Sequence, residues 1–215
     1  MTPDFLPTTP LMVKVKICGI TCLEDALAAV EAGADALGFV LYPPSPRYIS
    51  PEQAAAIIRR LPPFVQTVGL FVDEELSIVN TTADQCDLDV IQLHGDESPA
   101  YCESVRRRVI KAFRVKDFTV LDSLAQYRVA GHLLDAWSQA APGGTGQTFN
   151  WEIAATAAGS RPIILAGGLT PENVAEAVTH VKPYAVDVSS GVECSPGRKD
   201  SDMLRQFILR AKQPA

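Results

Sequence analysis

Disulfide frameworks, membrane spans and export signals all lack support in this sequence. Five cysteines occur among 215 residues, an odd number with no Cys-x-x-Cys pair, so neither a disulfide scaffold nor a structural zinc site is expected. No apolar run approaches the roughly 20 residues of a membrane-spanning helix. The stretch 1–11 has neither the basic start nor the apolar segment of a secretory signal. We therefore expect reduced thiols, a cytoplasmic protein and no contact with a membrane.

Basic residues are also scarce relative to acidic ones. With 19 lysines and arginines against 25 acidic residues, the net charge is −6 and the pI is about 5.1. Nucleic-acid binding instead requires a clustered basic surface. The run Arg106-Arg107-Arg108 is short, and we interpret it as the solvated end of a helix, where positive charge complements the helix dipole. We expect no nucleic-acid partner.

What the chain does contain is a regular alternation of strand and helix patterns. Val13–Thr21 alternates apolar and polar residues up to Cys18, and Gly19 then permits a sharp turn, which is typical of a strand and its end. Seven more apolar segments follow, at 36–41, 65–72, 88–93, 109–115, 132–135, 162–166 and 185–188. Helical patterns come after them or between them, at 24–32, from 50 onward, and at 74–83, 99–107, 118–127, 151–158, 171–180 and 202–212.

Eight strand–helix units predict a single-domain α/β fold, a (β/α)8 or TIM barrel over residues 13–215. Residues 1–12 contain three prolines and are expected to form a loose extension with no assigned role. The alternative is an open doubly wound sheet, which typically shows Gly-x-Gly-x-x-Gly after its first strand. Lys16–Thr21 reads KICGIT instead, so the barrel is favoured.

Clusters of small residues follow the last two predicted strands. The corresponding loops of barrels commonly hold a phosphate, because glycine lets backbone N–H groups approach it and a helix N-terminus adds partial positive charge. A helix capped by Thr170 is expected directly after the first cluster. The glycines could equally serve only to turn the chain, but two clusters at the two expected loops favour phosphate binding. The candidate phosphate residues are Gly167, Gly168, Ser189, Ser190 and Gly191.

Several further side chains fall at strand ends or in the loops after them, on the face where barrel enzymes carry out chemistry. Cys18 is a candidate base, although a free cysteine is more often a buried apolar residue. Asp135 is a candidate general acid or a loop cap, and Asp187 either orients a loop or contacts a substrate. Arg47 is suited to two-point binding of a carboxylate, with a surface arginine as the alternative. His94 is the histidine expected to face the barrel mouth, and a structural hydrogen-bonding role is favoured over a catalytic one.

Motifs occur in order at nearly every predicted strand-to-helix loop from Val13 to the C-terminus. They are Lys16–Thr21, Gly38–Val40 with Ser45–Arg47, Gln92–Gly95, Gly143–Gly146 with Phe149 and Trp151, Leu165–Leu169 with Asn173 and Val174, and Asp187–Glu193 with Pro196, Gly197, Lys199 and Asp200. This ordered set resembles the phosphoribosylanthranilate isomerase family of tryptophan biosynthesis, and it is far more specific than any single motif.

The resemblance implies an Amadori rearrangement of a small-molecule substrate. N-(5-phosphoribosyl)anthranilate becomes 1-(2-carboxyphenylamino)-1-deoxyribulose 5-phosphate, with no cofactor and no metal. Asp135 matches the general acid that opens the ribose ring, and Cys18 matches the general base that removes the proton from C2′. Arg47 matches the residue that holds the anthranilate carboxylate, and the glycine and serine clusters match the phosphate site. Pro142 departs from the family, which often has an aromatic residue before Gly143-Gly144. The sequence does not indicate the oligomeric state.

Other phosphate-binding barrels are the competing interpretations. Indole-glycerol-phosphate synthase and the histidine-pathway aminoaldose isomerase share the architecture and the phosphate site. The histidine enzyme, however, uses aspartates at the ends of its first and fifth strands, where this chain has Cys18 and the acid-free Phe113–Val115. A barrel that only binds a phosphosugar is a third possibility, but such a protein has no need for both Cys18 and Asp135.

Overall fold

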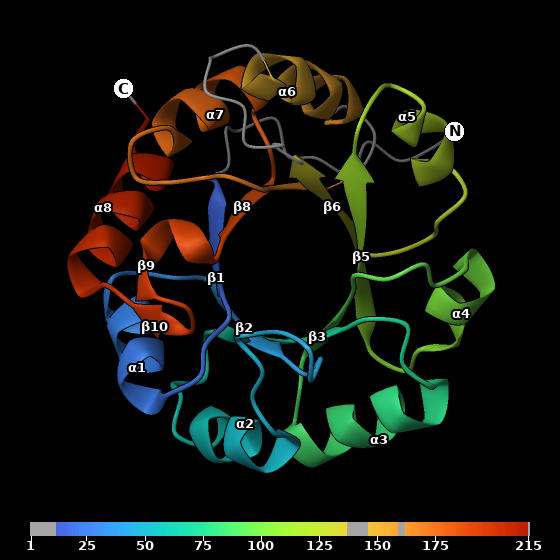
Figure 1. The fold of residues 1–215 in the computed structure, drawn as a ribbon, viewed down its shortest axis with the longest axis vertical. Coiled ribbons are helices and arrows are strands. Elements are labelled where there is room, and N and C mark those ends of the chain that lie inside the picture. Colours follow the sequence, from blue (N-terminus) through green and yellow to red (C-terminus); the bar gives the residue numbers. More distant parts are fainter. Residues whose placement is uncertain (1–11, 137–145, 159–161, 215) are drawn as a thin grey trace.

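Eight parallel strands close into a barrel that helices surround (Figure 1) in the computed structural model, which describes residues 12–136, 146–158 and 162–214. The strands are β1 Lys14–Cys18, β2 Ala36–Val40, β3 Gln66–Phe71, β4 Val90–Leu93, β5 Arg108–Val115, β6 Gly131–Ala136, β7 Ile163–Ala166 and β8 Ala185–Val188. The helices are α1 Leu23–Glu31, α2 Pro51–Ile58, α3 Leu76–Cys86, α4 Pro99–Ser104, α5 Val120–Leu124, α6 Gly146–Ala157, α7 Val174–Val181 and α8 Ser201–Lys212. Pairing of β8 with β1 closes the barrel, so the predicted (β/α)8 fold is confirmed.

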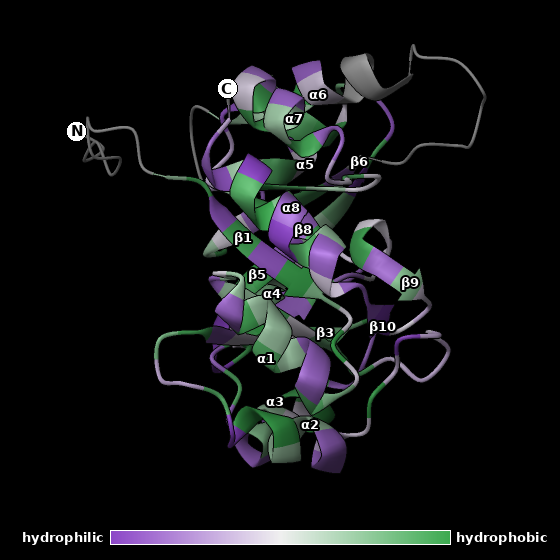
Figure 2. Cartoon of the chain, turned by 90° about the vertical axis from the view of Figure 1, so that its left-hand side faces the viewer, coloured by the Kyte–Doolittle hydropathy of each residue, from purple (hydrophilic) through white to green (hydrophobic). Residues whose placement is uncertain are grey.

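The alternation in the first strand has a structural reason. Val15 and Ile17 are fully buried and belong to the large core between the strands and the helices. Lys16 and Cys18, between and after them, point to the barrel interior, because successive side chains of a strand point to opposite faces. Figure 2 shows this alternation as green and purple bands along β1. A smaller apolar cluster on strands β5 to β8 is formed by Ala112, Leu133, Ile164, Ala166 and Ala185.

The helix after β7 begins one turn later than predicted. It starts at Val174, whereas the sequence predicted a start at Pro171 with Thr170 as the cap. Thr170 Oγ1 accepts a hydrogen bond from the Glu172 amide (3.2 Å), and Asn173 Oδ1 accepts one from the Thr170 amide (2.8 Å). Side chains that bond to nearby backbone in this way stabilise a turn at the expense of the helix.

The sequence predicted that the arginine run lies at the end of a helix, and this prediction is wrong. Helix α4 stops at Ser104 instead of reaching residue 107, because Val105 has an extended backbone. Arg106 and Arg107 form ion pairs with Asp84 of α3 (2.6 and 3.2 Å), and Arg108 opens β5. The run therefore bridges neighbouring units of the barrel wall.

Helix α6 also differs from the prediction, since it begins at Gly146 and not at Trp151. A short hairpin after β8 was not predicted at all. A single 3-10 turn, η1 Ser190–Val192, leads into β9 Glu193–Ser195, which pairs with β10 Arg198–Lys199. The hairpin projects from one end of the barrel (Figure 2), and it carries two side chains of the site described below.

Parts of two predicted features lie outside the described residues. They are the N-terminal extension, apart from Met12, and the loop motif at 143–145 together with Pro142. Over the described ranges, none of the helices combines the length and the apolar character that crossing a membrane requires.

Candidate active site

A cavity of about 410 Å³ opens at the carboxyl ends of the strands, which is the end where barrel enzymes hold their active sites. The structure brings every site residue that the sequence predicted to the wall of this one cavity. These residues are Cys18, Arg47, Asp135, Gly167, Gly168, Asp187, Ser189, Ser190 and Gly191. Their proximity was expected from the strand ends, and their individual roles stay predictions.

Cys18 ends β1, and its thiol is buried against charged groups. Burial raises the pKa of the thiol above its usual value, and Asp187 adds to the increase, while the positive charges of Lys16 and Lys199 oppose it. Lys199 Nζ donates to the carbonyl oxygen of Cys18 at 2.6 Å and so fixes the end of the strand. At neutral pH Cys18 is therefore mainly a thiol, and action as a base depends on charges that favour the thiolate.

Lys16 and Asp187 form a buried ion pair across the seam of the barrel. Lys16 Nζ lies 2.9 Å from Asp187 Oδ1, and only 5% and 9% of the two side chains are exposed. Burial alone would lower the pKa of Lys16, but the charges of Asp187 and Cys18 raise it to about 12. Asp187 therefore holds a permanent ammonium group inside the barrel, and neither of its two predicted roles included this contact.

Arg47 is held by the hairpin after β8. Its Nε donates to Glu193 Oε1 (2.9 Å), and its Nη2 donates to Glu193 Oε2 (2.7 Å). Lys199 Nζ donates to the same carboxylate at 2.8 Å. Burial raises the pKa of Glu193, but these hydrogen bonds outweigh it and lower the pKa overall. One edge of the Arg47 guanidinium is thus occupied, and the Nη1 edge has no partner among the described residues, which leaves it for a ligand.

Asp135, near the end of β6, has a histidine beside it. His94 Nε2 lies 3.4 Å from Asp135 Oδ2, and His94 Nδ1 lies 3.3 Å from the Gln92 amide nitrogen. A neutral ring with its hydrogen on Nε2 satisfies both contacts, because Nδ1 then accepts from Gln92. The contact with Gln92 is the kind of hydrogen bond expected of His94, and its role beside Asp135 stays a prediction.

The two predicted phosphate loops pack directly against each other. Gly167 and Gly168 have φ values of 85° and 65°, a region that glycine adopts without strain. Asn173 Nδ2 donates to the carbonyl oxygen of Gly168 at 2.9 Å and holds this loop. A Cβ on Gly191 would overlap the carbonyl oxygen of Leu169, so only glycine fits where the loops meet.

The two serines of the loop after β8, Ser189 and Ser190, line the cavity. Ser189 Oγ is buried and has no hydrogen-bond partner within the described part of the chain. Ser190 begins the turn η1. The sequence predicted a helix directly after the glycines, but α7 starts only at Val174. The assignment of a phosphate to the two loops stays a prediction.

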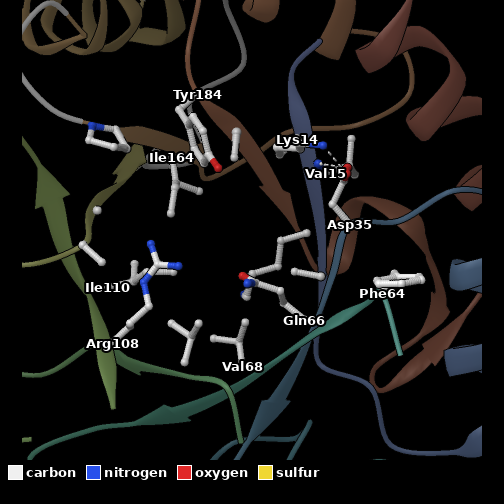
Figure 3. A pocket seen from close by; sticks show the side chains of 17 residues that line it. Lys14, Val15, Asp35, Phe64, Gln66, Val68, Arg108, Ile110, Ile164 and Tyr184 are labelled. Carbon is white, nitrogen blue, oxygen red and sulfur yellow. Dashed lines mark hydrogen bonds and ion pairs between the residues drawn. The ribbon is translucent and has the colours of Figure 1, made fainter. Parts of the chain in front are cut away.

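A second cavity, of about 310 Å³, lies at the opposite end of the barrel. Figure 3 shows the side chains of Gln66, Arg108 and Tyr184 pointing into it, with Phe64 at its rim. Phe64 is 98% exposed. None of the predicted site residues lines this second cavity, so we place the active site in the first cavity.

Sequence reasoning assigned no site role to Lys16, Gln92, Glu193 or Lys199. A lysine inside an otherwise buried strand was the available signal for Lys16, whereas Glu193 and Lys199 come together with Arg47 only through the unpredicted hairpin. In the described ranges, no three His, Cys, Asp or Glu side chains gather as ligands of a metal ion would.

Comparisons with a family model, with curated proteins and with solved structures all point to one isomerase family. Residues 15–210 match the family model for N-(5'-phosphoribosyl)anthranilate (PRA) isomerase. The N-(5'-phosphoribosyl)anthranilate isomerase of Geobacter sulfurreducens is 68% identical over 201 residues, which cover 94% of this chain and 99% of that protein.

Solved structures agree with these sequence matches. The crystal structure of phosphoribosyl anthranilate isomerase from Thermotoga maritima has a TM-score of 0.87 and 49% identity, covering 94% of this chain and 99% of that one. A phosphoribosyl anthranilate isomerase in complex with reduced 1-(o-carboxyphenylamino)-1-deoxyribulose 5-phosphate has a TM-score of 0.85 and 46% identity, with coverage of 94% and 99%.

Proposed function

The chain belongs to the N-(5'-phosphoribosyl)anthranilate isomerase family, and from this membership we propose how its residues carry out the reaction. The enzyme converts N-(5'-phosphoribosyl)anthranilate into 1-(2-carboxyphenylamino)-1-deoxyribulose 5-phosphate in tryptophan biosynthesis. Asp135 is the general acid in our proposal, and Cys18 is the general base. The observation that carries the proposal is the gathering of Cys18, Asp135, Arg47 and both small-residue loops around one cavity.

Ring opening comes first and depends on Asp135. The carboxylic acid donates its proton to the ribose ring oxygen, and the bond from this oxygen to C1′ breaks. The lone pair of the anthranilate nitrogen forms a double bond to C1′, which gives an iminium ion and a free hydroxyl. His94, 3.4 Å from Asp135, keeps the carboxyl group oriented for this transfer.

Proton removal follows and depends on Cys18. The thiolate takes the proton from C2′, and the electron pair of that C–H bond forms the double bond between C1′ and C2′. The positive nitrogen accepts the electrons of the iminium bond, so the product is a neutral enolamine, which tautomerises to the ketone. Because the substrate nitrogen supplies and takes back the electrons, the reaction proposed here requires no cofactor.

The two ends of the substrate explain the remaining specialised residues. The phosphate group is assigned to Gly167, Gly168 and the Ser189–Gly191 loop, whose unpartnered Ser189 hydroxyl supports an anionic ligand. The anthranilate carboxylate is assigned to the free edge of Arg47. The relative that was solved with a reduced product-like molecule has a ligand with the same two ends, which supports a substrate of this class.

The test of the proposal is turnover. The purified protein should consume N-(5'-phosphoribosyl)anthranilate, measured as the loss of anthranilate fluorescence, without added metal or cofactor. A protein that bound phosphate but left this substrate unchanged would support the phosphosugar-binding alternative instead.

Arg47→Lys should raise KM about 10–100-fold and change kcat little. Lysine keeps the positive charge, but it loses the two-point geometry, and a hydrogen bond to a charged group contributes about 1.5–3 kcal/mol. Steady-state kinetics measure both constants. An unchanged KM would show that the carboxylate is bound elsewhere.

Domain organisation and location complete the proposal. We assign catalysis to the barrel from residue 13 onward and no part in it to residues 1–12. All five cysteines are free, which supports a reducing compartment, the cytoplasm.

A further inference from the structure

Cys18, the general base proposed for this reaction, lies in a buried environment that disfavours its thiolate form. Burial raises the pKa of the Cys18 thiol, so some group must favour the thiolate for the base to act at neutral pH. Charged groups approach Cys18 from several elements of the barrel. They are Lys16 on its own strand, Asp187 on β8, Lys199 on β10 and Arg47 in the loop after β2.

All three cations have another partner, and that of Lys16 is Asp187. Arg47 and Lys199 both bind the Glu193 carboxylate, and Lys199 also donates to the backbone oxygens of Cys18 and Ser189. Burial lowers the pKa of Lys199, although Glu193 opposes this. Lys16 differs from Lys199 because its pKa is raised to about 12, so Lys16 stays charged throughout the working range.

The position of Lys16 relative to the thiol follows from Gly38 of β2. A Cβ on Gly38 would lie 2.8 Å from Cys18 Sγ and 2.9 Å from Lys16 Nζ. The sulfur and the ammonium nitrogen therefore meet over the same bare backbone position and are at most about 6 Å apart, within the range over which one charge affects another's titration. A side chain at residue 38 would force at least one of the two groups away.

We propose that Lys16 is a positioning residue for catalysis, whose ammonium group stabilises the Cys18 thiolate, while Asp187 holds this ammonium in place. The proposal rests on the assignment of Cys18 as the base. Asp187 is bound to Lys16 at 2.9 Å, but its negative charge also acts against the thiolate. The two members of the ion pair should therefore affect Cys18 in opposite directions, which a purely structural pair would not do.

The test measures the reactivity of Cys18 without relying on turnover. Iodoacetamide alkylation of Cys18 is followed against pH by mass spectrometry of the peptide that carries it, in a Cys22→Ser background that removes the neighbouring thiol. Lys16→Met should slow alkylation at neutral pH at least tenfold, because an opposite charge at this distance shifts a pKa by about 1–3 units. Lys16→Arg should restore most of the rate.

Asp187→Asn should accelerate alkylation of Cys18, since the thiolate then becomes the counter-ion of Lys16. Lys111→Met is the matched control, because Lys111 forms an equally buried pair with Glu97 at 3.1 Å on another part of the barrel. This control should destabilise the protein without changing alkylation of Cys18. If Lys16→Met is too unstable to measure, Lys16→Met/Asp187→Asn removes both charges, and it should alkylate more slowly than Asp187→Asn.

Equal alkylation rates in the wild type and in Lys16→Met, or equal rates in the double variant and in Asp187→Asn, would overturn the proposal. That failure differs from failure of the base assignment. If Cys18→Ala kept its activity, Cys18 would not be the base, whatever Lys16 does to its thiol. If Cys18→Ala were inactive and alkylation were independent of Lys16, only the role of Lys16 would be lost.

Discussion

Cys18→Ala is expected to lower kcat by about 10²–10⁴-fold, the usual loss when a general base is removed. The thiol ends β1 at the wall of the cavity, and alanine leaves no group there that accepts the C2′ proton. The remaining contacts of the site do not involve this side chain, so KM should change much less than kcat. The measurement is the initial rate of fluorescence loss at saturating substrate.

A matched control separates catalysis from packing. Cys102 is as buried as Cys18, at 4% against 5% exposure, and it does not line the cavity. Cys102→Ala should keep the wild-type kcat, with thermal unfolding used to show that both variants are folded. Cys18→Ser tests the assignment more directly. Serine is a poorer base than cysteine, so removal of the C2′ proton should become the rate-limiting step. A C2′-deuterated substrate should then show a larger isotope effect than with the wild type, and turnover of Cys18→Ala at the wild-type rate would refute the assignment.

Asp135→Asn is expected to lower kcat by a similar factor of about 10²–10⁴. The amide has the shape of the carboxyl group and keeps an oxygen beside His94, but it has no acidic proton for the ring oxygen. Without that proton the ring stays closed, so the iminium ion does not form. The expected kinetic sign is a fall in kcat with no increase in the C2′ isotope effect, because ring opening becomes limiting.

Binding measurements distinguish this loss from a damaged site. The affinity for the product, measured by calorimetry, should stay within a few-fold of the wild type, because the phosphate loops and Arg47 are unaltered. His94→Gln is an informative companion, since it removes an orienting group without removing the acid, and it should cost less than Asp135→Asn. A fully active Asp135→Asn would mean that the proton comes from another group.

Local patterns predicted the architecture because they reflect local physics. Strand alternation, helix periodicity and turn residues depend on neighbours within a few positions, and these were sufficient for the eight units and their order. The boundaries were less predictable. Hydrogen bonds of Thr170 and Asn173 shift the start of α7 to Val174, and the extended backbone of Val105 ends α4 early. Both effects depend on single residues.

By itself, the sequence determined which residues stand at strand ends, and barrel closure then carries those residues to one face. That is why Cys18, Asp135 and Arg47 were found in one cavity as expected. Only the tertiary structure decided the electrostatic partners. Lys16 and Asp187 are 171 residues apart, and Arg47 and Glu193 are 146 apart. These pairs exist because β8 closes onto β1 and because the hairpin after β8 folds back over the site, and no local pattern encodes either contact.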